Sequence, residues 1–311
     1  MKWIKKGLIF KTEKQFDWMN SHAQCPTAIL LEDRIRIFFS ARLENQQSLP
    51  TYIDVEKENP QKIIYLNPNP VLERGRRGTF DENGIIPSCF VYKDNQLYFY
   101  YAGWSQGKNV PYKNFTGMAI SKDNGLTFTK FTEAPVFSLN QFDPLSATGP
   151  CIIFKDNEYI AIYSTGIDWL EIDGKLEHTY QLTYATSKDA IHWESSGKMI
   201  IDPVNEFEAD CKPAIIEHNG IYHMWFSTRG SHNFRKPGNT AYRLGYAFST
   251  DMIQWTRDDA NSGIDISEEG WDSEMICYPS ITRYKNKLYM FYNGNGFGKS
   301  GFGYAELELD K

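Results

Sequence analysis

The chain has 311 residues, of which 41% are hydrophobic and 23% charged, and a formal net charge of −6. This composition is typical of a globular protein, and the acidic balance excludes a general basic field that would attract nucleic acid or an anionic membrane. The aromatic fraction of 15% is high and favours an all-β fold or a sugar-binding surface.

The N-terminal segment, residues 1–10, is charged, and its apolar stretch is too short for a signal-peptide core. No run of about 18 apolar residues follows anywhere in the sequence. The five cysteines are an odd number without a CxxC pair, which indicates neither a disulfide framework nor a zinc site. We therefore expect a soluble cytoplasmic protein.

One sequence design recurs five times along the chain, each time around a proline. The prolines stand 61, 63, 63 and 66 residues apart, at Pro26, Pro87, Pro150, Pro213 and Pro279. Each unit reads as a strand after the proline, a polar turn such as KDNQ, KDNE, EHNG or KNK, and a second strand rich in Tyr and Phe. An internal repeat of this length is typical of a modular β fold.

Three units add a further strand that ends in Ser-x-Asp and is followed by an aromatic residue, in segments 121–128, 187–193 and 249–255. The aromatic residues of these segments, Phe128, Trp193 and Trp255, are predicted to pack between units. Four strands in about 60 residues, without helical periodicity, are the pattern of a β-propeller blade.

The last unit ends within 32 residues of Pro279 and lacks its outermost strand, which residues 2–10 can supply. We therefore predict an all-β, five-bladed β-propeller with four-stranded antiparallel blades, closed by the N-terminal strand. It forms a single domain over residues 1–311.

In such a fold, the segments just before the five prolines should converge on one axial pocket, where a ligand is expected to bind. Four of these segments carry acids, namely Asp81, Glu82, Asp143, Glu206, Glu208, Asp210, Asp272 and Glu274. The first segment offers Asp17 and His22. Converging carboxylates cost free energy unless a ligand, cation or proton compensates them, so their joint pattern indicates function beyond turn formation.

Cations and aromatic residues at equivalent places suggest the ligand's chemistry. The cations are Arg42, Lys212, Arg229 and Arg243, which suit a carboxylate or phosphate if they face the pocket. Trp104, Trp169 and Phe297 follow second strands and are predicted to stack on sugar rings, with Asn293 as a further substrate-binding candidate beside them.

The five repeats, the Ser-x-Asp signature and the acids before the strands resemble the five-bladed β-propeller glycosidases of glycoside hydrolase families 43, 32, 68 and 130. More narrowly, GTFDENGIIPS, YAGW, GWDSEMICYP and YNGNGFGKSGFGYA resemble bacterial glycosidase-like proteins associated with surface-polysaccharide gene clusters. The segment DWMNSHAQCP is similar to the invertase-like Trp-Met-Asn-Asp-Pro motif, but Ser21 stands where that motif has its Asp. This difference argues against a fructosidase.

The resemblance implies a carbohydrate-active enzyme that cleaves or transfers a glycosyl unit, on an anionic or surface-polysaccharide sugar. Glycoside cleavage generally needs one protonated carboxyl group and a second carboxylate. We assign Asp81 as base or nucleophile and Glu208 or Glu274 as general acid. Apolar neighbours of Glu274 are expected to raise its pKa, as a proton donor requires.

Two alternatives stay open. Family 130 phosphorylases bind phosphate with basic residues, and Arg42, Lys212, Arg229, Arg243 and His178 are candidates for this role in a phosphorylase or glycosyltransferase. A non-catalytic glycan-binding propeller would carry the same aromatic residues and cations without needing paired carboxylates.

No metal or other cofactor is predicted. Asp and Asn oxygens near a propeller axis can hold Ca²⁺, but no Asp-x-Asp-x-Asp loop is present, and the six histidines form no HExxH-like group. The expected partner is a carbohydrate, anionic or phosphorylated, and neither nucleic acid nor membrane is expected.

Overall fold

The structure is a computed structural model that describes residues 1–309. Almost all of its regular structure is β-strand, as predicted. The helical elements among these residues are one four-residue helix, α1 (Asn295–Gly298), and one 3₁₀ turn, η1 (Asp259–Asn261). No helix within this range is both long and apolar enough to cross a bilayer.

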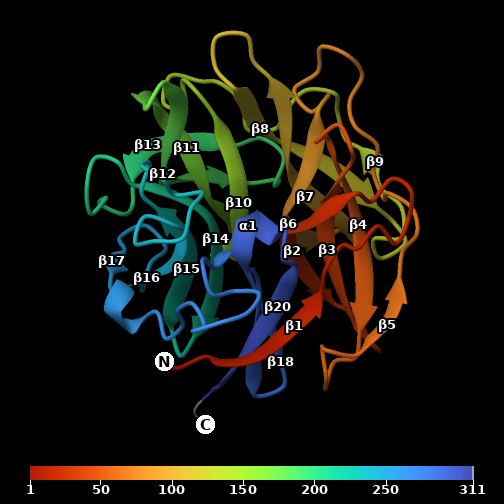
Figure 1. Cartoon of the computed structure of the whole chain (residues 1–311). Coiled ribbons are helices and arrows are strands. Elements are labelled where there is room, and N and C mark those ends of the chain that lie inside the picture. Colours follow the sequence, from red (N-terminus) through yellow and green to blue (C-terminus); the bar gives the residue numbers. More distant parts are fainter. Residues whose placement is uncertain (310–311) are drawn as a thin grey trace.

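Antiparallel pairing follows chain order within five runs of strands (Figure 1). The first run is β2 (Ser21–Leu30), β3 (Ile35–Arg42), β4 (Ser48–Val55) and β5 (Ile63–Leu66). The second is β6 (Gly84–Lys93), β7 (Gln96–Gln106), β8 (Tyr112–Ser121) and β9 (Thr129–Lys130). The third is β10 (Ala147–Lys155), β11 (Glu158–Ile172), β12 (Lys175–Ser187) and β13 (Glu194–Met199).

The last two runs are separate sheets. One is β14 (Ala209–His218), β15 (Ile221–Arg229), β16 (Arg243–Ser249) and β17 (Thr256–Arg257). The other is β18 (Cys277–Tyr284), β19 (Lys287–Asn293) and β20 (Phe302–Glu308), to which β1 (Ile4–Phe10) adds antiparallel to β20. The N-terminal strand thus pairs with the last strand of the chain, as expected from the incomplete fifth unit.

The first strands of the five runs lie toward the middle of the molecule (Figure 1). Each contacts the first strand of the next run, and β18 contacts β2. Parallel pairing at Ser48↔Gly84 and Ala147↔Phe115 joins the first three runs into one sheet. The segments that lead into the first strands therefore come together, although they are far apart in the sequence.

The predicted polar turns form tight hairpins because their residues accept left-handed backbone angles. Asp94 and Asn95 have φ values of 51° and 57°, and Asp156 and Asn157 have 50° and 62°. Two central residues with positive φ are the mark of a type I′ turn, whose twist matches that of the strands it joins. Turn chemistry therefore sets the register of β6–β7 and β10–β11.

Each first strand is irregular where the repeated proline stands. The pairing register shifts at this point in all five strands. In four of them the residue before the proline has positive φ, with values of 54° at Cys25, 67° at Gly149, 51° at Lys212 and 58° at Tyr278. Such bulges bend a strand and re-aim its side chains, and they recur here at the centre of the molecule.

The core consists of apolar clusters between neighbouring runs. Trp193 of the third run packs against a cluster that includes Tyr100 of the second, and Phe128 packs against Phe38 of the first. Trp255 packs against residues of the third run. The prediction that these three aromatic residues pack between units is confirmed.

Candidate functional site

A cavity of about 450 Å³ lies where the five first strands meet. Each strand contributes to its wall at or near the repeated proline: Gln24 and Cys25 from β2, Ile86 to Ser88 from β6, Thr148 and Gly149 from β10, Cys211 and Lys212 from β14, and Tyr278 from β18. We call this space the central cavity. The backbone segments around the five prolines therefore meet at one pocket, as predicted.

The rest of the lining is aromatic and polar. Trp104 lies in the wall, where its Nε1 donates a hydrogen bond to Ser48 Oγ at 3.0 Å. Tyr112, Tyr180 and Tyr242 complete the aromatic part. Such flat side chains can stack on the C–H faces of a sugar.

Two cations face the central cavity, and neither forms an ion pair with any carboxylate in residues 1–309. Arg42 Nε donates to Gln24 Oε1 at 3.0 Å, and burial lowers the pKa of its guanidinium. Lys212 is 6% exposed, and its Nζ donates to the carbonyl oxygen of Ser88 at 2.6 Å. An unpaired buried charge is costly, so this arrangement favours binding of an anion.

Arg229 lies behind the cavity wall and supports it. Its Nε donates to the hydroxyl groups of Tyr180 and Tyr242 at 3.2 and 3.3 Å, and its Nη2 donates to the carbonyl oxygen of His178 at 2.7 Å. Its guanidinium carbon stands 3.7 Å from the centre of the Phe234 ring. Arg229, predicted to bind substrate, does not line the cavity; instead, it holds the two cavity tyrosines in place.

No acidic residue lines the central cavity within the described part of the chain, so the predicted convergence of carboxylates there is wrong. Three of the acids instead share one arrangement. Each accepts a hydrogen bond from a tyrosine 20 residues later and from a side chain near the outer edge of the fold. The tyrosine distances are 3.1 Å for Asp81–Tyr101, 2.8 Å for Asp143–Tyr163 and 2.9 Å for Asp272–Tyr292.

The outer partners complete this arrangement. Lys130 of β9 lies 2.5 Å from Asp81, and Lys5 of β1 lies 2.8 Å from Asp272. Ser195 of β13 donates to Asp143 at 2.9 Å. Asp81 and Asp272 each have a local cation, whereas Asp143 accepts hydrogen bonds at Oδ2 and its buried Oδ1 has no partner within residues 1–309. Because the carboxylates lie apart, the repulsion that convergence would produce is avoided.

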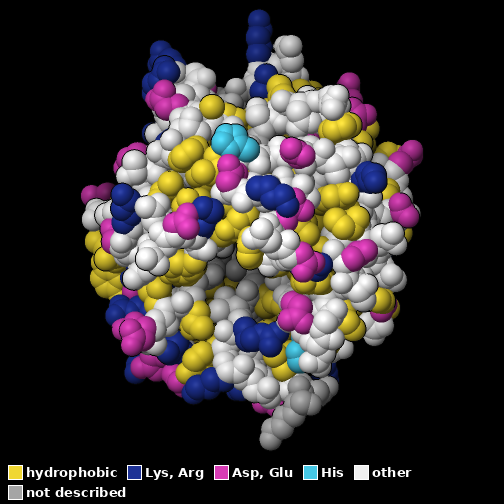
Figure 2. Space-filling view, turned by 180° about the vertical axis from the view of Figure 1, so that it is seen from behind, with side chains coloured by type: hydrophobic (Ala, Val, Ile, Leu, Met, Phe, Trp, Pro, Cys, Tyr) yellow, Lys and Arg dark blue, Asp and Glu magenta, His cyan; other side chains and the backbone are white. Residues whose placement is uncertain are grey.

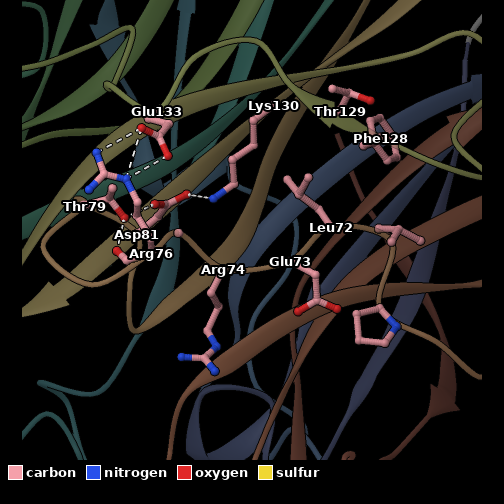
Figure 3. Close-up of a pocket in the computed structure, with 13 residues that line it drawn as sticks. Leu72, Glu73, Arg74, Arg76, Thr79, Asp81, Phe128, Thr129, Lys130 and Glu133 are labelled. Carbon is pink, nitrogen blue, oxygen red and sulfur yellow. Dashed lines mark hydrogen bonds and ion pairs between the residues drawn. The ribbon is translucent and has the colours of Figure 1, made fainter.

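Asp81 contributes to a different pocket, of about 420 Å³, shown in Figure 3. There Asp81 points to Lys130 and Thr79, and Arg76 pairs with Glu133 at the edge. Because the oxygens of Asp81 accept from Thr79, Lys130 and Tyr101, its carboxylate is fully engaged.

Glu208 lies away from the cavity as well. Its carboxylate pairs with Arg257 Nη1 at 2.5 Å, and Asp210 lies 3.8 Å from the same atom. Burial, followed by the neighbouring Glu208, raises the pKa of Asp210 well above its ordinary value. The two carboxylates and Arg257 form a compact buried cluster.

Glu274 is the one predicted catalytic residue whose carboxylate forms no hydrogen bond or ion pair with residues 1–309. Its backbone is fixed, since its N–H donates to Asn295 Oδ1 at 2.8 Å and its carbonyl accepts from Arg243 Nη1 at 3.0 Å. Arg243 itself lies in a separate surface pocket and pairs with Asp265 at 3.2 Å. Arg243 is therefore not brought to the central cavity.

Neither Asn293 nor His22 lines the cavity, and Asn293 holds the backbone near it. Asn293 Oδ1 accepts from the Cys25 N–H at 2.7 Å, while its Nδ2 donates to the carbonyl oxygen of Ala23 at 2.7 Å. The ring of His22 contacts Ser21 Oγ at 2.9 Å. Burial, together with Arg42 and Lys299, lowers the pKa of His22 to about 4.

Trp169 and His178 form a stacked pair beside the cavity, with ring centres 4.3 Å apart and an interplanar angle of 8°. Tyr112, which does line the cavity, meets both rings edge-on. Burial and then Arg229 lower the pKa of His178 to about 4, so its imidazole is neutral at pH 7. Trp169 therefore stacks on a histidine in this structure, and neither residue lines the cavity.

Of the predicted site residues, the structure brings Arg42, Trp104 and Lys212 together in the central cavity. Sequence reasoning missed most of the polar and aromatic lining: Gln24, Ser88, Tyr112, Asn114, Ser146, Thr148, Ser164, Tyr180, Tyr242 and Tyr278. Several of these lie within two residues of a repeated proline, and that position was the signal that could have identified them.

The outer surface seen in Figure 2 is mixed in charge, and the described residues contain no metal-binding group. Figure 2 views the face opposite to that of Figure 1, where basic and acidic side chains are interspersed around a hollow near the middle. Among residues 1–309, no three His, Cys, Asp or Glu side chains form a group that could hold a metal ion.

The sequence is similar over its length to the uncharacterized protein MT1551 of Mycobacterium tuberculosis (strain CDC 1551 / Oshkosh). Identity is 34% over 310 residues, which cover 99% of this chain and 100% of the relative. A 1,2-beta-oligomannan phosphorylase of Thermoanaerobacter sp. (strain X514) is 24% identical over 197 residues, which cover 62% of this chain and 59% of that protein. No protein-family model matches the sequence.

Solved structures with the same fold are glycoside hydrolases and related proteins. A glycoside hydrolase superposes with a TM-score of 0.76 at 16% identity, covering 99% of this chain and 92% of that chain. A structure from the GH130 family of mannoside phosphorylases superposes with a TM-score of 0.73 at 16% identity, covering 99% and 96%. That family contains glycoside hydrolases that target beta-1,2 mannosidic linkages in Candida mannan. At these identities the similarity shows the fold alone.

Proposed function

From the premise that this chain belongs to the same family as MT1551 of M. tuberculosis and has the fold of the glycoside hydrolase propellers, we propose that it is a carbohydrate-active enzyme. In this proposal, the central cavity binds an anionic or phosphorylated sugar, or a sugar together with phosphate. The enzyme transfers a glycosyl unit to or from that anion. Hydrolysis between two carboxylates in the cavity is the less favoured reaction.

The observation that carries this proposal is the charge of the cavity wall. Arg42 and Lys212 face the cavity without a carboxylate partner, and none of the lining residues in the described chain is acidic. An anion would offset both desolvated charges, whereas a hydrolase of the usual kind needs two carboxyl groups on either side of the scissile bond.

We propose Glu274 as the proton donor of this reaction. Asp81 and Glu208, the other two candidates, are held in ion pairs with Lys130 and Arg257. A carboxyl group that donates a proton must be free of such partners, because a nearby cation favours its ionised form. The carboxylate of Glu274 meets this condition. Glu274 does not itself line the central cavity, but it lies in the segment that leads into β18, whose Tyr278 does.

Thermal unfolding with inorganic phosphate tests the anion site. The melting temperature of the unmodified protein should rise with phosphate concentration, because a ligand that binds the folded state stabilises it. Lys212→Met and Arg42→Gln should lose this rise, and Arg243→Gln, a cation in another pocket, should keep it. A melting temperature that phosphate leaves unchanged in the unmodified protein contradicts the proposal.

Turnover tests the enzymatic part. Because relatives by sequence and fold include an oligomannan phosphorylase and a mannoside phosphorylase family, β-1,2-mannobiose with phosphate is the first substrate to assay, with mannose 1-phosphate and free mannose as the products. Glu274→Gln should reduce the rate at least a hundredfold while leaving the melting temperature within 1–2 °C. Unchanged turnover in Glu274→Gln would remove this residue from the mechanism.

A non-catalytic glycan-binding protein is the second candidate. The same acid-free cavity wall favours it, because binding needs no carboxylate pair. Saturable sugar binding, with no product formed when phosphate or water is the acceptor, would favour a glycan-binding protein over an enzyme.

We also infer that the five strand runs are the blades of a five-bladed propeller, each of four strands and closed by β1. Their antiparallel pairing and the contact between β18 and β2 support this inference. A cytoplasmic location stays a prediction. The five free cysteines support it, since a reducing compartment keeps thiols unpaired.

A further inference from the structure

Four polar side chains that line the central cavity each carry a buried atom with no hydrogen-bond partner among residues 1–309. The buried atoms are Asn114 Oδ1 from β8, Ser146 Oγ from the segment before β10, Thr148 Oγ1 from β10 and Ser164 Oγ from β11. We call these four residues the polar wall. Leaving a buried hydroxyl or amide oxygen unbonded costs about 1–3 kcal/mol, so four of them together require an explanation outside the local fold.

The strand pairing brings the polar wall together. Thr148 and Ser164 are direct partners in the β10–β11 ladder, and Ala147, between Ser146 and Thr148, pairs with Phe115, next to Asn114. A hydroxyl group can turn about its χ1 bond toward a ligand, and side-chain rotations of this kind are common on binding. The polar wall therefore offers donors and acceptors that a sugar's hydroxyl groups can satisfy.

One end of the polar wall is closely packed against a glycine. Ser146 Oγ and His178 Nε2 approach Gly166 so closely that a Cβ atom there would lie 2.6 Å from both. Both ring nitrogens of His178 are also buried, with no hydrogen-bond partner in the described part of the chain.

The polar wall and the two cations line the same cavity. A Cβ atom on Gly149 would lie 3.9 Å from the backbone nitrogen of Lys212 and 4.0 Å from Ser164 Oγ. Gly149 has a φ of 67°, a conformation that favours glycine, and no side chain fills the space between the two. Because Arg42, Lys212 and the polar wall all line one cavity of about 450 Å³, a single monosaccharide can contact both sides of it.

We propose that the central cavity is a two-sided site for a single monosaccharide that carries its own oxyanion. The polar wall binds the ring hydroxyl groups, and Arg42 and Lys212 bind the anionic substituent. This inference rests on the proposed function and extends it, because it assigns the hydroxyl groups and the anion to one molecule and fixes the direction in which that molecule lies.

Isothermal titration with defined probes tests the inference. The probes are inorganic phosphate, mannose, mannose 1-phosphate, mannose 6-phosphate and glucuronate. At least one of the three anionic sugars should bind tenfold or more tightly than both inorganic phosphate and mannose. Tighter binding of glucuronate identifies a carboxylate as the anion, and tighter binding of a mannose phosphate identifies a phosphate.

Variants then separate the two sides of the site. Thr148→Val and Ser164→Ala each remove one hydroxyl group of the polar wall, and each should weaken the best anionic sugar about 3- to 10-fold while leaving the Kd of inorganic phosphate unchanged. Lys212→Met should weaken both probes. Thr165→Val is the matched control, because Thr165 Oγ1 is also buried without a partner among residues 1–309 but the residue does not line the cavity. Its affinities should equal those of the unmodified protein.

The outcomes distinguish this inference from the proposed function. If no anionic probe binds the unmodified protein, the anion site itself is wrong and the proposed function fails. If phosphate and anionic sugars bind but Thr148→Val and Ser164→Ala leave their affinity ratio unchanged, the proposed function survives and the polar wall is not a sugar site. Weakening by Thr165→Val equal to that by Ser164→Ala would also overturn the inference, because the effect would then be a general one on β11.

Discussion

Replacing Asp81 by asparagine separates a structural carboxylate from a catalytic one. Asp81 is 1% exposed and accepts hydrogen bonds from Tyr101 at 3.1 Å, Lys130 at 2.5 Å and Thr79 at 3.0 Å. Removing one partner of a buried ion pair costs about 3–5 kcal/mol. Because the side chain of Lys130 is 19% exposed and can regain water, we expect Asp81→Asn to cost about 2–3 kcal/mol.

The reverse substitution should be more harmful. Lys130→Met leaves the Asp81 carboxylate almost fully buried without its cation, so it should cost about 3–5 kcal/mol. The double variant removes both charges, and its cost should fall about 2 kcal/mol or more below the sum of the two single costs. Asp94→Asn, in an exposed hairpin turn, is the control and should change stability by less than about 0.5 kcal/mol.

Urea unfolding followed by tryptophan fluorescence measures these differences, and titration with inorganic phosphate measures the cavity. We expect Asp81→Asn to unfold at lower urea concentration while its phosphate affinity stays within twofold of the unmodified protein. The reasoning is refuted if Asp81→Asn unfolds at the normal urea concentration and yet abolishes turnover, since that pattern belongs to a catalytic carboxylate.

Three further predictions concern the rest of the fold. The pKa of Asp210 is raised in the folded state, so the native protein holds the extra proton and stability should fall as pH rises above about 4; urea midpoints across pH should show this fall, and Asp210→Asn should flatten it. Burial raises the pKa of Cys25 to about 12 and that of Cys211 to about 11, so both thiols should react with a disulfide reagent at pH 8 far more slowly in the native protein than in urea; equal rates would contradict their burial. Lys5→Met should cost about 2–4 kcal/mol in urea unfolding by stranding Asp272, and a cost below about 0.5 kcal/mol would show that the Lys5–Asp272 pair does not hold β1 in place.

Much of the strand pattern could be predicted because it depends on neighbouring residues. Asp94-Asn95 and Asp156-Asn157 form turns through their own backbone preferences, and the strands on either side follow from them. The packing of Trp193 between units could be predicted as well, since an aromatic residue that recurs once per unit in a β repeat has the same environment each time.

The direction in which the acidic side chains point could not be predicted in this way. Asp81 and Asp272 stand at the expected entries to the first strands, but their partners Lys130 and Lys5 lie 49 and 267 positions away. Sequence spacing shows that a carboxylate is near a strand entry, but it does not show whether the side chain points to the centre or to an outer strand.

The sequence by itself determined the repeat, the turns, the strand order and the approach of five proline segments to one place, because these follow from local backbone preferences repeated along the chain. Only the tertiary structure decided which side chains occupy that place. Bulges with left-handed residues at Cys25, Gly149, Lys212 and Tyr278 turn a lysine, a thiol and a tyrosine inward. The carboxylates of Asp81 and Asp272 lie outside the central cavity, where they pair with lysines and tyrosines, because a buried charge is stable only beside its partner.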